Sequence, residues 1–342
     1  MKENVKKSRN SSPILLGIGM FVVVLLLLFS YMFYQRLMGE ASNALGEEAV
    51  KYNRHYVLIC DTKDSDVWNE IYEGMQEKAF SEDAYLEMMT PDETNQYSFS
   101  DLVDICIAAK VDGIVIQNHD EKGLDKKIDE ASQAGIPVVT LMEDSPSTGR
   151  ISHVGASPYT VAELYANEII ESVRQKYPAG EEIKVAVILT EDDIDREQYQ
   201  QFSEINTRLT NELGDYKIRA SAIRTNAREN FYYEETIRDL YRGKDIPNYV
   251  VCFNSLVTDA VYQTVIDYNA VNTTNILGSY MSPTTKQGLE NNIVIGTLLP
   301  ESKQISEYAI QALTEYIESG HTNAFFGIDV SLLKKGDLQD DK

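Results

Sequence analysis

From residue 55 onward, short apolar runs alternate with segments whose apolar residues recur every three or four positions. Runs such as HYVLIC at 55–60 and DGIVIQ at 112–117 are typical of buried strands. The segment 66–80 places Ile71 and Met75 one helical turn apart on a single face, which predicts an amphipathic helix. This alternation favours βα units, in which helices cover both faces of a parallel sheet.

The same pattern predicts an α/β fold with two doubly wound lobes, divided near residue 155. We predict strands at 55–60, 84–89, 112–117, 136–142, 151–155, 183–189, 216–223, 248–253, 275–278, 292–298 and 325–332. We predict helices at 66–80, 99–110, 121–134, 161–177, 197–213, 230–241, 256–268, 282–290 and 301–318. The tail KKGDLQDDK is expected to be frayed.

The first residues carry a different pattern. Residues 13–34 contain no charge and as a helix would span about 33 Å, enough for a bilayer core. Four basic residues precede this segment, so we expect residues 1–12 in the cytoplasm and the folded part outside it. Residues 35–53 are polar with helical periodicity and are expected to form a stalk. A cleaved signal peptide is the alternative, although its apolar region would be shorter.

Composition and charge exclude several classes of protein. The chain has 342 residues, 43% hydrophobic and 25% charged, which is typical of a folded chain. Its formal net charge of −23 disfavours a nucleic-acid partner. Cys60, Cys106 and Cys252 lie in apolar stretches without a CxxC pair, so we expect buried thiols and neither disulfides nor a zinc site.

The loops that follow the predicted strands hold the candidate chemistry, because ligands of wound sheets bind at the carboxyl ends of the strands. These loops are rich in carboxylates, amides and hydroxyls, which suit a polyhydroxylated ligand. Trp68 either stacks on such a ligand or belongs to the core, and single loop acids are commonly solvated. The loops are 61–68, 90–93, 117–120, 142–146, 190–196, 224–230, 254–256 and 279–283.

Motifs for catalysis or metal binding are weak. Asp64-Ser65-Asp66 lacks the glycine and distal glutamate of a calcium loop. There is no GxSxG, P-loop or GxGxxG motif, and the adjacent acids Asp192 and Asp193 would seldom face one substrate. We therefore expect no enzyme activity, no catalytic residue, no cofactor and no metal.

Several stretches resemble the ribose-binding-protein type of periplasmic solute-binding protein. They are CDTKDSDVWNEIYEGMQEKA, AAKVDGIVIQ, AGIPVVTLMEDSP, SHVGASPYTVAELYANEI and FNSLVTDAVYQTV. The resemblance covers about residues 55–333 and implies two lobes joined by three crossovers, with a hinge that closes on a sugar. It implies one lobe of 54–157 and 301–323 and another of 158–300 and 324–333. No helix-turn-helix precedes this region, so a repressor is disfavoured.

The resemblance also implies positions for the ligand site. Residues at or beside family positions, or in the corresponding loops, are Ser65, Asp66, Trp68, Asn118, Met142, Glu143, Asp144, Arg196, Gln198, Phe231, Asn254, Tyr280 and Leu298. Trp68 and Phe231 match stacking aromatics, and Asn254 matches an asparagine. Met142 and Glu143 replace an Asp-Arg pair that grips sugar hydroxyls, and Tyr280 and Leu298 replace an aspartate and a glutamine. These departures indicate a modified or less polar ligand, or a role that depends on a partner.

The leading hypothesis is a membrane-anchored extracytoplasmic protein that binds a sugar or sugar-like molecule by hinge closure. It would present the closed form to an ABC permease or a sensor histidine kinase, and the sequence does not choose between them. The alternative is an interaction module with a degenerate sugar site, for which Met142, Tyr280 and Leu298 are the best support.

Overall fold

The computed structural model describes residues 52–61, 65–91, 97–118, 121, 123–190, 196–225, 232–243 and 245–339. The chain divides into two compact units, Met1–Tyr52 and Asn53–Lys342, and every described helix and strand lies in the second. The predicted membrane segment 13–34 lies outside the described residues. Among the helices that are described, none has the length and apolar character needed to cross a membrane.

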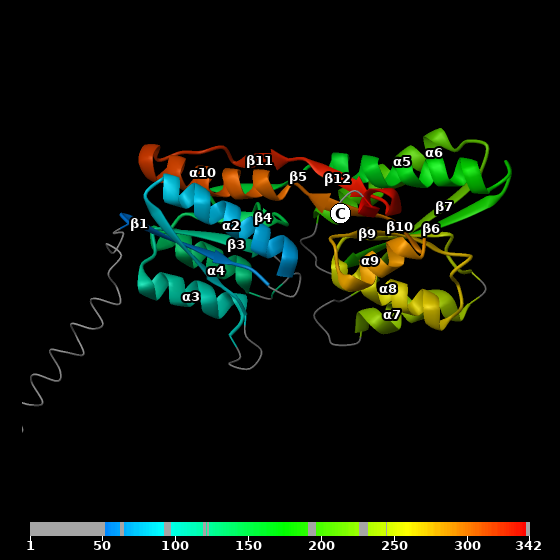
Figure 1. Ribbon diagram of the computed structural model, residues 1–342, viewed down its shortest axis with the longest axis horizontal. Coiled ribbons are helices and arrows are strands. Elements are labelled where there is room, and N and C mark those ends of the chain that lie inside the picture. The colour runs from blue at the N-terminus through cyan, green and yellow to red at the C-terminus, as the bar shows by residue number, and fades with distance from the viewer. Residues whose placement is uncertain are drawn as a thin grey trace, which may run out of the picture. The chain divides into compact units, whose positions relative to one another are not determined.

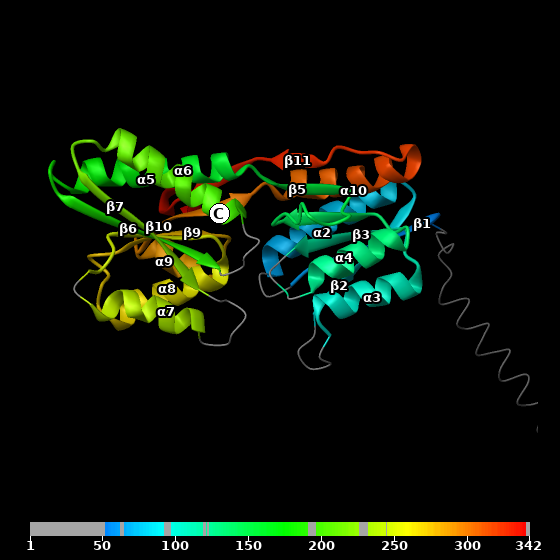
Figure 2. The same cartoon turned by 180° about the vertical axis from the view of Figure 1, so that it is seen from behind.

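The first lobe is built on a six-stranded sheet whose strands are all parallel. In spatial order the strands are β11 (Phe325–Ile328), β5 (Ser152–Ala156), β4 (Val138–Met142), β3 (Gly113–Asn118), β1 (Arg54–Ile59) and β2 (Ala84–Met89). Its helices are α2 (Ser65–Ser81), α3 (Phe99–Ala109), α4 (Leu124–Gln133) and α10 (Ser302–Ser319). Figures 1 and 2 show α2 and α10 side by side on one face of this sheet, with α3 and α4 on the other.

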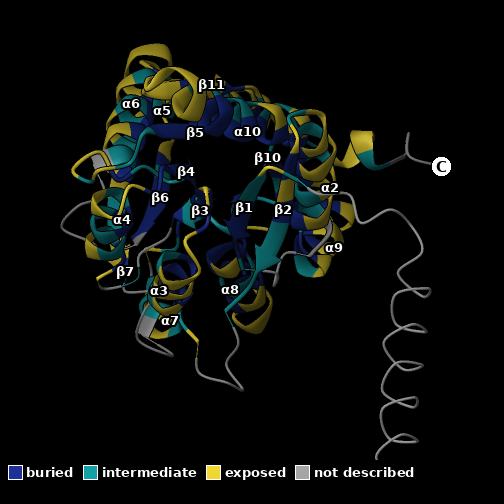
Figure 3. Cartoon of the chain, turned by 90° about the vertical axis from the view of Figure 1, so that its left-hand side faces the viewer, coloured by how far each residue is buried: buried dark blue, intermediate teal, exposed yellow. Residues whose placement is uncertain are grey.

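Strand β1 shows why the sheet is covered on both sides. Tyr56 and Leu58 pack with α2 and α10, whereas Val57 and Ile59 point to α3 and α4. All four side chains are fully buried, so the strand is a continuous apolar run in the sequence and does not alternate between apolar and polar residues. Figure 3 shows the buried strands in dark blue, with exposed residues on the outer surfaces of the helices.

Local signals fix where helices begin and how closely they pack. Ser98 caps α3: its hydroxyl accepts from the Asp101 N–H, and the Asp101 carboxylate accepts from the Ser98 N–H. Gly74 lets α2 approach α10, because a Cβ atom there would lie 2.7 Å from the Ser306 hydroxyl oxygen. That hydroxyl donates to the carbonyl of Ile71 at 2.8 Å and joins the two helices.

The second lobe repeats the arrangement with one antiparallel edge strand. Its sheet has the order β12 (Val330–Leu333), β10 (Val294–Pro300), β9 (Asn275–Ser279), β8 (Tyr249–Cys252), β6 (Glu182–Thr190) and β7 (Lys217–Thr225). Helices α5 (Pro158–Lys176) and α6 (Arg196–Glu212) cover one face. Helices α7 (Tyr232–Arg242), α8 (Ser255–Asp267) and α9 (Pro283–Glu290) cover the other.

The chain crosses between the lobes three times: between β5 and α5, between β10 and α10, and between β11 and β12. The last crossing corrects the prediction of one strand at 325–332 and of a second-lobe segment at 324–333. The run is interrupted at Asp329, so that β11 pairs with β5 in the first sheet and β12 with β10 in the second. Gln304 of α10 holds this break, because its side chain accepts from the Asp329 N–H at 2.7 Å.

Two smaller features complete the picture. The prediction of buried thiols is confirmed: Cys60, Cys106 and Cys252 are buried and free, and burial raises the pKa of Cys60 to about 12. The prediction of a frayed tail is wrong for Lys335–Gln339, which forms a short 3-10 helix. This helix is attached to the second lobe, because Leu338 packs against the core beside α8 and α9.

Candidate functional site

A pocket of about 660 Å³, including its open mouth, is lined by residues of both lobes. It lies at the carboxyl ends of the strands, where ligands of wound parallel sheets bind. The first lobe contributes Met142, Glu143, Ala156 and Ile328. The second contributes Val161, Glu197, Gln198, Gln201, Phe253, Ser279, Tyr280, Leu298, Pro300 and Val330. A lining that mixes apolar, aromatic and polar side chains is typical of sites for small organic molecules.

Met142 and Tyr280 occupy equivalent positions, each at the end of the fourth strand of its lobe. Both have left-handed backbones, with φ of 68° and 65°, which non-glycine residues adopt at a cost of about 1 kcal/mol or more. At Met142 the Glu143 N–H donates to the Leu141 carbonyl at 2.9 Å, closing a γ-turn of the rare, strained type. Two strained residues facing one pocket from opposite lobes are typical of a binding site.

The polar side of the pocket comes from the first turns of α6. Glu197 and Gln201 lie one helical turn apart, and the Gln201 amide N–H donates to the Glu197 carboxylate at 3.4 Å. Gln198 and Gln201 are buried, with 5% and 6% exposure. The Gln201 carbonyl oxygen has no hydrogen-bond partner among the described residues. A buried acceptor without a partner is costly in a folded chain, so this atom suits a donor from a ligand.

The second-lobe floor is held by a buried tyrosine. The Tyr165 hydroxyl lies 2.7 Å from the Ser279 hydroxyl and donates to the Gly278 carbonyl at 2.9 Å. Burial raises the pKa of Tyr165, so the phenol stays neutral and can donate. Its ring packs edge-on against Phe253, with ring centres 6.0 Å apart. This packing orients the Phe253 ring that lines the pocket.

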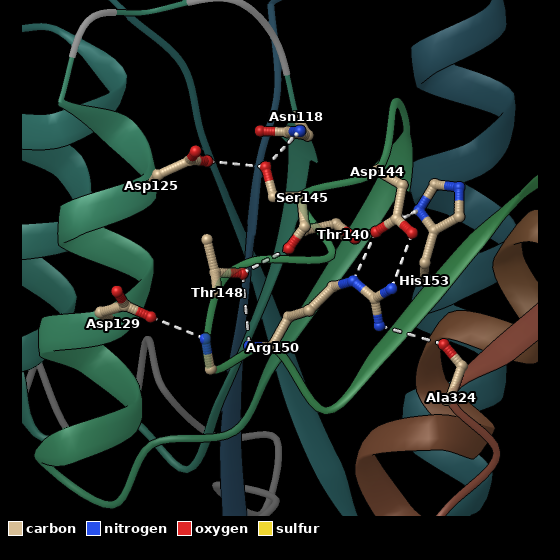
Figure 4. A network of polar contacts seen from close by, with 11 residues as sticks. Asn118, Asp125, Asp129, Thr140, Asp144, Ser145, Thr148, Arg150, His153 and Ala324 are labelled. Carbon is tan, nitrogen blue, oxygen red and sulfur yellow. Dashed lines mark hydrogen bonds and ion pairs between the residues drawn. The ribbon is translucent and has the colours of Figure 1, made fainter. Parts of the chain in front are cut away.

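The first-lobe wall, which follows Met142, is held by an ion pair. Arg150 pairs with Asp144 through two nitrogen atoms, one contact measuring 2.7 Å, and also donates to the Ala324 carbonyl at 3.1 Å (Figure 4). Asp144 also lies 3.9 Å from the Nδ1 atom of His153, which is buried in β5. The wall is thereby tied to the segment that connects α10 with β11.

A second set of hydrogen bonds holds the same loop from the other side (Figure 4). The Asn118 amide donates to the Ser145 hydroxyl at 2.9 Å, and that hydroxyl donates to Asp125 at 2.7 Å. Asn118 and Asp144 thus position the loop that begins at Met142 and do not line the pocket.

The sequence-predicted site residues therefore separate into three groups. Those that line the pocket are Met142, Glu143, Gln198, Tyr280 and Leu298. Those placed elsewhere are Trp68, Asn118, Asp144 and Asn254. Those outside the described part are Phe231 and the side chains of Ser65, Asp66 and Arg196.

Trp68 and Asn254 both have structural roles in the fold. Trp68 is 3% exposed and belongs to the core between α2 and its sheet, because it continues the helix face of Ile71 and Met75. Asn254 caps α8, where its side-chain oxygen accepts from the Val257 N–H at 2.8 Å.

The other lining residues are not among the site residues predicted from the sequence, although Ser279 lies in one of the predicted strand-end loops. Ala156, Pro300, Ile328 and Val330 lie on strands at the crossovers, which neither the strand-end rule nor the family resemblance singles out. The signal that could have found Gln201 was its i+4 spacing from Glu197. Among the described residues there is no group of three His, Cys, Asp or Glu side chains placed to hold a metal ion.

Comparison with known proteins agrees with this geometry. Residues 56–322 match the profile of the periplasmic binding protein domain. The chain belongs to the periplasmic binding protein family. No curated protein matches it.

Solved periplasmic binding proteins share the fold. The glucose-galactose binding protein GanP from Geobacillus stearothermophilus is 23% identical, with a TM-score of 0.69 over 84% of this chain and 99% of its own. One chain of a XylFII-LytSN complex is 25% identical to this chain. The match has a TM-score of 0.63 and covers 84% of this chain and 100% of the chain in the complex. The arabinose binding protein AraP from Geobacillus stearothermophilus is 15% identical, with a TM-score of 0.66 over 84% of this chain and 98% of AraP.

Proposed function

We propose that this periplasmic binding protein takes a sugar or sugar-like molecule into the pocket between its lobes and catalyses no reaction on it. The observation that carries the proposal is the lining itself, which combines carboxylates and amides with the Phe253 and Tyr280 rings, and which both lobes supply. Acceptor groups suit hydroxyl donors, and aromatic rings suit the apolar face of a sugar ring. A ligand that contacts both lobes would favour the closed hinge.

The proposed setting is the outer side of a membrane, with the apolar segment 13–34 as the anchor. An anchored binding protein acts at high effective concentration on a neighbour in the same membrane. We propose a sensor histidine kinase or an ABC permease as that neighbour. The XylFII-LytSN complex supports a protein partner, since it joins a protein of this fold to a second protein.

Calorimetric titration of the full chain in detergent against a panel of monosaccharides tests the binding proposal. We expect saturable heat at one site for at least one ligand, and weaker binding by Phe253→Ala because the lining ring is lost. Phe80→Ala serves as the matched control, since Phe80 is 62% exposed at the end of α2 and does not line the pocket. An absence of heat with every ligand would argue against a sugar-type site.

A ligand-independent interaction module is the second candidate. It is favoured by the apolar side chains Met142 and Leu298, at positions where the family resemblance implies polar sugar contacts. In that case a partner would bind the purified chain with the same affinity whether or not the sugar panel is present.

A further inference from the structure

One side of the pocket is apolar and belongs to the crossovers between the lobes. Ala156 ends β5 at the first crossover, Pro300 ends β10 at the second, and Ile328 and Val330 flank the third. In the paired strands Ile328 lies opposite Ala156, and Val330 lies opposite Pro300, so the four residues are neighbours. We call these four residues the crossover patch.

The crossover patch joins the hydrophobic cores of the two lobes. Ala156 packs against both cores, Ile328 is buried in the first-lobe core, and Val330 packs against the second. Val161, in the first turn of α5, and Leu298 of β10 are buried in the second core and extend the apolar lining. A ligand group on this patch would therefore contact carbon atoms of both lobes.

The side chains of the crossover patch neither donate nor accept hydrogen bonds. Pro300 also lacks a backbone N–H. Asp329, in the middle of the third crossover, directs its polar groups to α10. Its N–H donates to the Gln304 side chain at 2.7 Å, its carboxylate accepts from the same side chain at 2.8 Å, and its carbonyl accepts from the Glu301 N–H at 3.0 Å. The polar side chains of the lining lie elsewhere, on α6, at the end of β9 and after the end of β4.

A sugar hydroxyl and a methyl group bind differently to such a surface. A hydroxyl that loses its water there gains no partner from the patch side chains, and an unpaired polar group is costly to bury. A methyl group loses no hydrogen bond, and its burial against carbon atoms is favourable. Apolar pockets discriminate by about tenfold or more between ligands that differ by one such group.

We propose that the pocket selects a 6-deoxyhexose, whose ring carries a methyl group where a hexose carries CH₂OH, and that this methyl group lies on the crossover patch. The ring hydroxyls lie toward the polar side chains of α6 and β9, and the ring face lies against Phe253 or Tyr280. This inference rests on the proposed function, because it assigns the ligand class of the same pocket. A methyl group that contacts both lobes would also favour the closed hinge.

Calorimetry with matched sugars tests the assignment on the full chain in detergent. The members of a set share one ring configuration and carry a methyl group, CH₂OH or hydrogen at the same ring carbon. The sets are D-fucose, D-galactose and L-arabinose; 6-deoxy-D-glucose, D-glucose and D-xylose; L-fucose, L-galactose and D-arabinose; and L-rhamnose, L-mannose and L-lyxose. In any set that binds, the methyl member is expected to bind about tenfold tighter than the CH₂OH member, equivalent to about 1.4 kcal/mol. It should also bind severalfold tighter than the hydrogen member, which makes no contact with the patch.

Variants connect this preference with the crossover patch. Val330→Thr replaces one methyl group of the patch by a hydroxyl at nearly the same volume, and Val161→Thr does the same beside it. Each should reduce the preference for the methyl member over the CH₂OH member severalfold, because the new hydroxyl can pair with CH₂OH. Val271→Thr is the matched control and should leave the preference unchanged, because Val271 packs against the core beside α8 and α9 and does not line the pocket. A preference that both pocket variants leave intact would overturn the assignment.

The outcomes separate this inference from the proposed function. If the CH₂OH member or the hydrogen member of a set binds as tightly as the methyl member, or more tightly, the ligand class is wrong and a sugar site stands. If no set gives heat, both the ligand class and the sugar site are contradicted.

Discussion

Acidification provides a test of the network that holds the first-lobe wall of the pocket. His153 lies in β5 with 2% exposure, and its Nδ1 atom is 3.1 Å from the Thr140 hydroxyl. Burial lowers the pKa of His153 to about 4, with Arg150 lowering it further and Asp144 opposing the shift. The ring stacks on Phe325, with ring centres 5.8 Å apart, so protonation would place a charge in a packed site.

The magnitude follows from the difference between folded and unfolded chains. In the unfolded chain the pKa of the histidine is about 6.5, so that chain takes up the proton first as the pH falls. The folding contribution of neutral His153 is complete above about pH 6.5 and decreases as the pH falls toward about 4. The free energy of unfolding should fall by about 2 kcal/mol between about pH 7.5 and pH 5, and by about 3 kcal/mol by pH 4.

Urea unfolding of the full chain and of His153→Gln, followed by circular dichroism at about pH 7.5, 6 and 5, measures this difference. At about pH 7.5 the variant should be the less stable protein, because its amide does not fit the stacked site. The difference in free energy of unfolding between the two proteins should decrease by about 2 kcal/mol at about pH 5, because the variant lacks the titrating group. Parallel pH dependences for the two proteins would refute the placement of a buried, neutral His153.

Three further predictions concern packing around the pocket. Gly278→Ala should lower the free energy of unfolding in urea by about 2 kcal/mol, because the added Cβ would lie 2.6 Å from the Thr258 side chain. Gly214→Ala is the control and should leave the free energy of unfolding nearly unchanged, because its Cβ would meet open space. Tyr165→Phe should cost about 1 to 2 kcal/mol of unfolding free energy, because buried hydrogen bonds lose their donor, and an unchanged denaturation midpoint would contradict those bonds. Met142→Gly relieves about 1 kcal/mol of left-handed strain, which a similar gain of unfolded-chain entropy offsets. The variant also loses the packing of the Met142 side chain against the first-lobe core, so the free energy of unfolding in urea should fall by about 1 kcal/mol, and calorimetric affinity should fall with the lost lining.

The alternation of apolar runs and helical faces was sufficient to predict the two wound lobes, because burial on both faces of a parallel sheet imposes that pattern on the residues themselves. The split between β11 and β12 could not be predicted. The run FFGIDVSL looks like one strand, and the break at Asp329 is set by contacts with α10, where the Glu301 N–H donates to the Asp329 carbonyl at 3.0 Å. Long-range contacts of this kind leave no periodic signal in the sequence.

The strand-end rule predicted the part of the site that lies on loops, whereas Gln198 in α6 and Leu298 in β10 were predicted only through the family resemblance. Met142 and Tyr280 follow directly from the rule that ligands bind at the carboxyl ends of parallel strands. Trp68 also lies just after a strand end, so the same rule places it near the ligand. It continues a buried helix face as well, and its side chain packs into the core. Asp144 shows a similar competition, because a nearby arginine that no local spacing reveals engages its carboxylate.

Hydrogen–deuterium exchange with the tightest-binding ligand tests most directly whether the pocket between the lobes is the binding site. At saturation, we expect protection together in residues 142–143 of the first lobe and in residues 197–201 and 279–280 of the second, because all three segments line the pocket. Protection confined to one lobe, or found only in segments away from the pocket, would contradict the account.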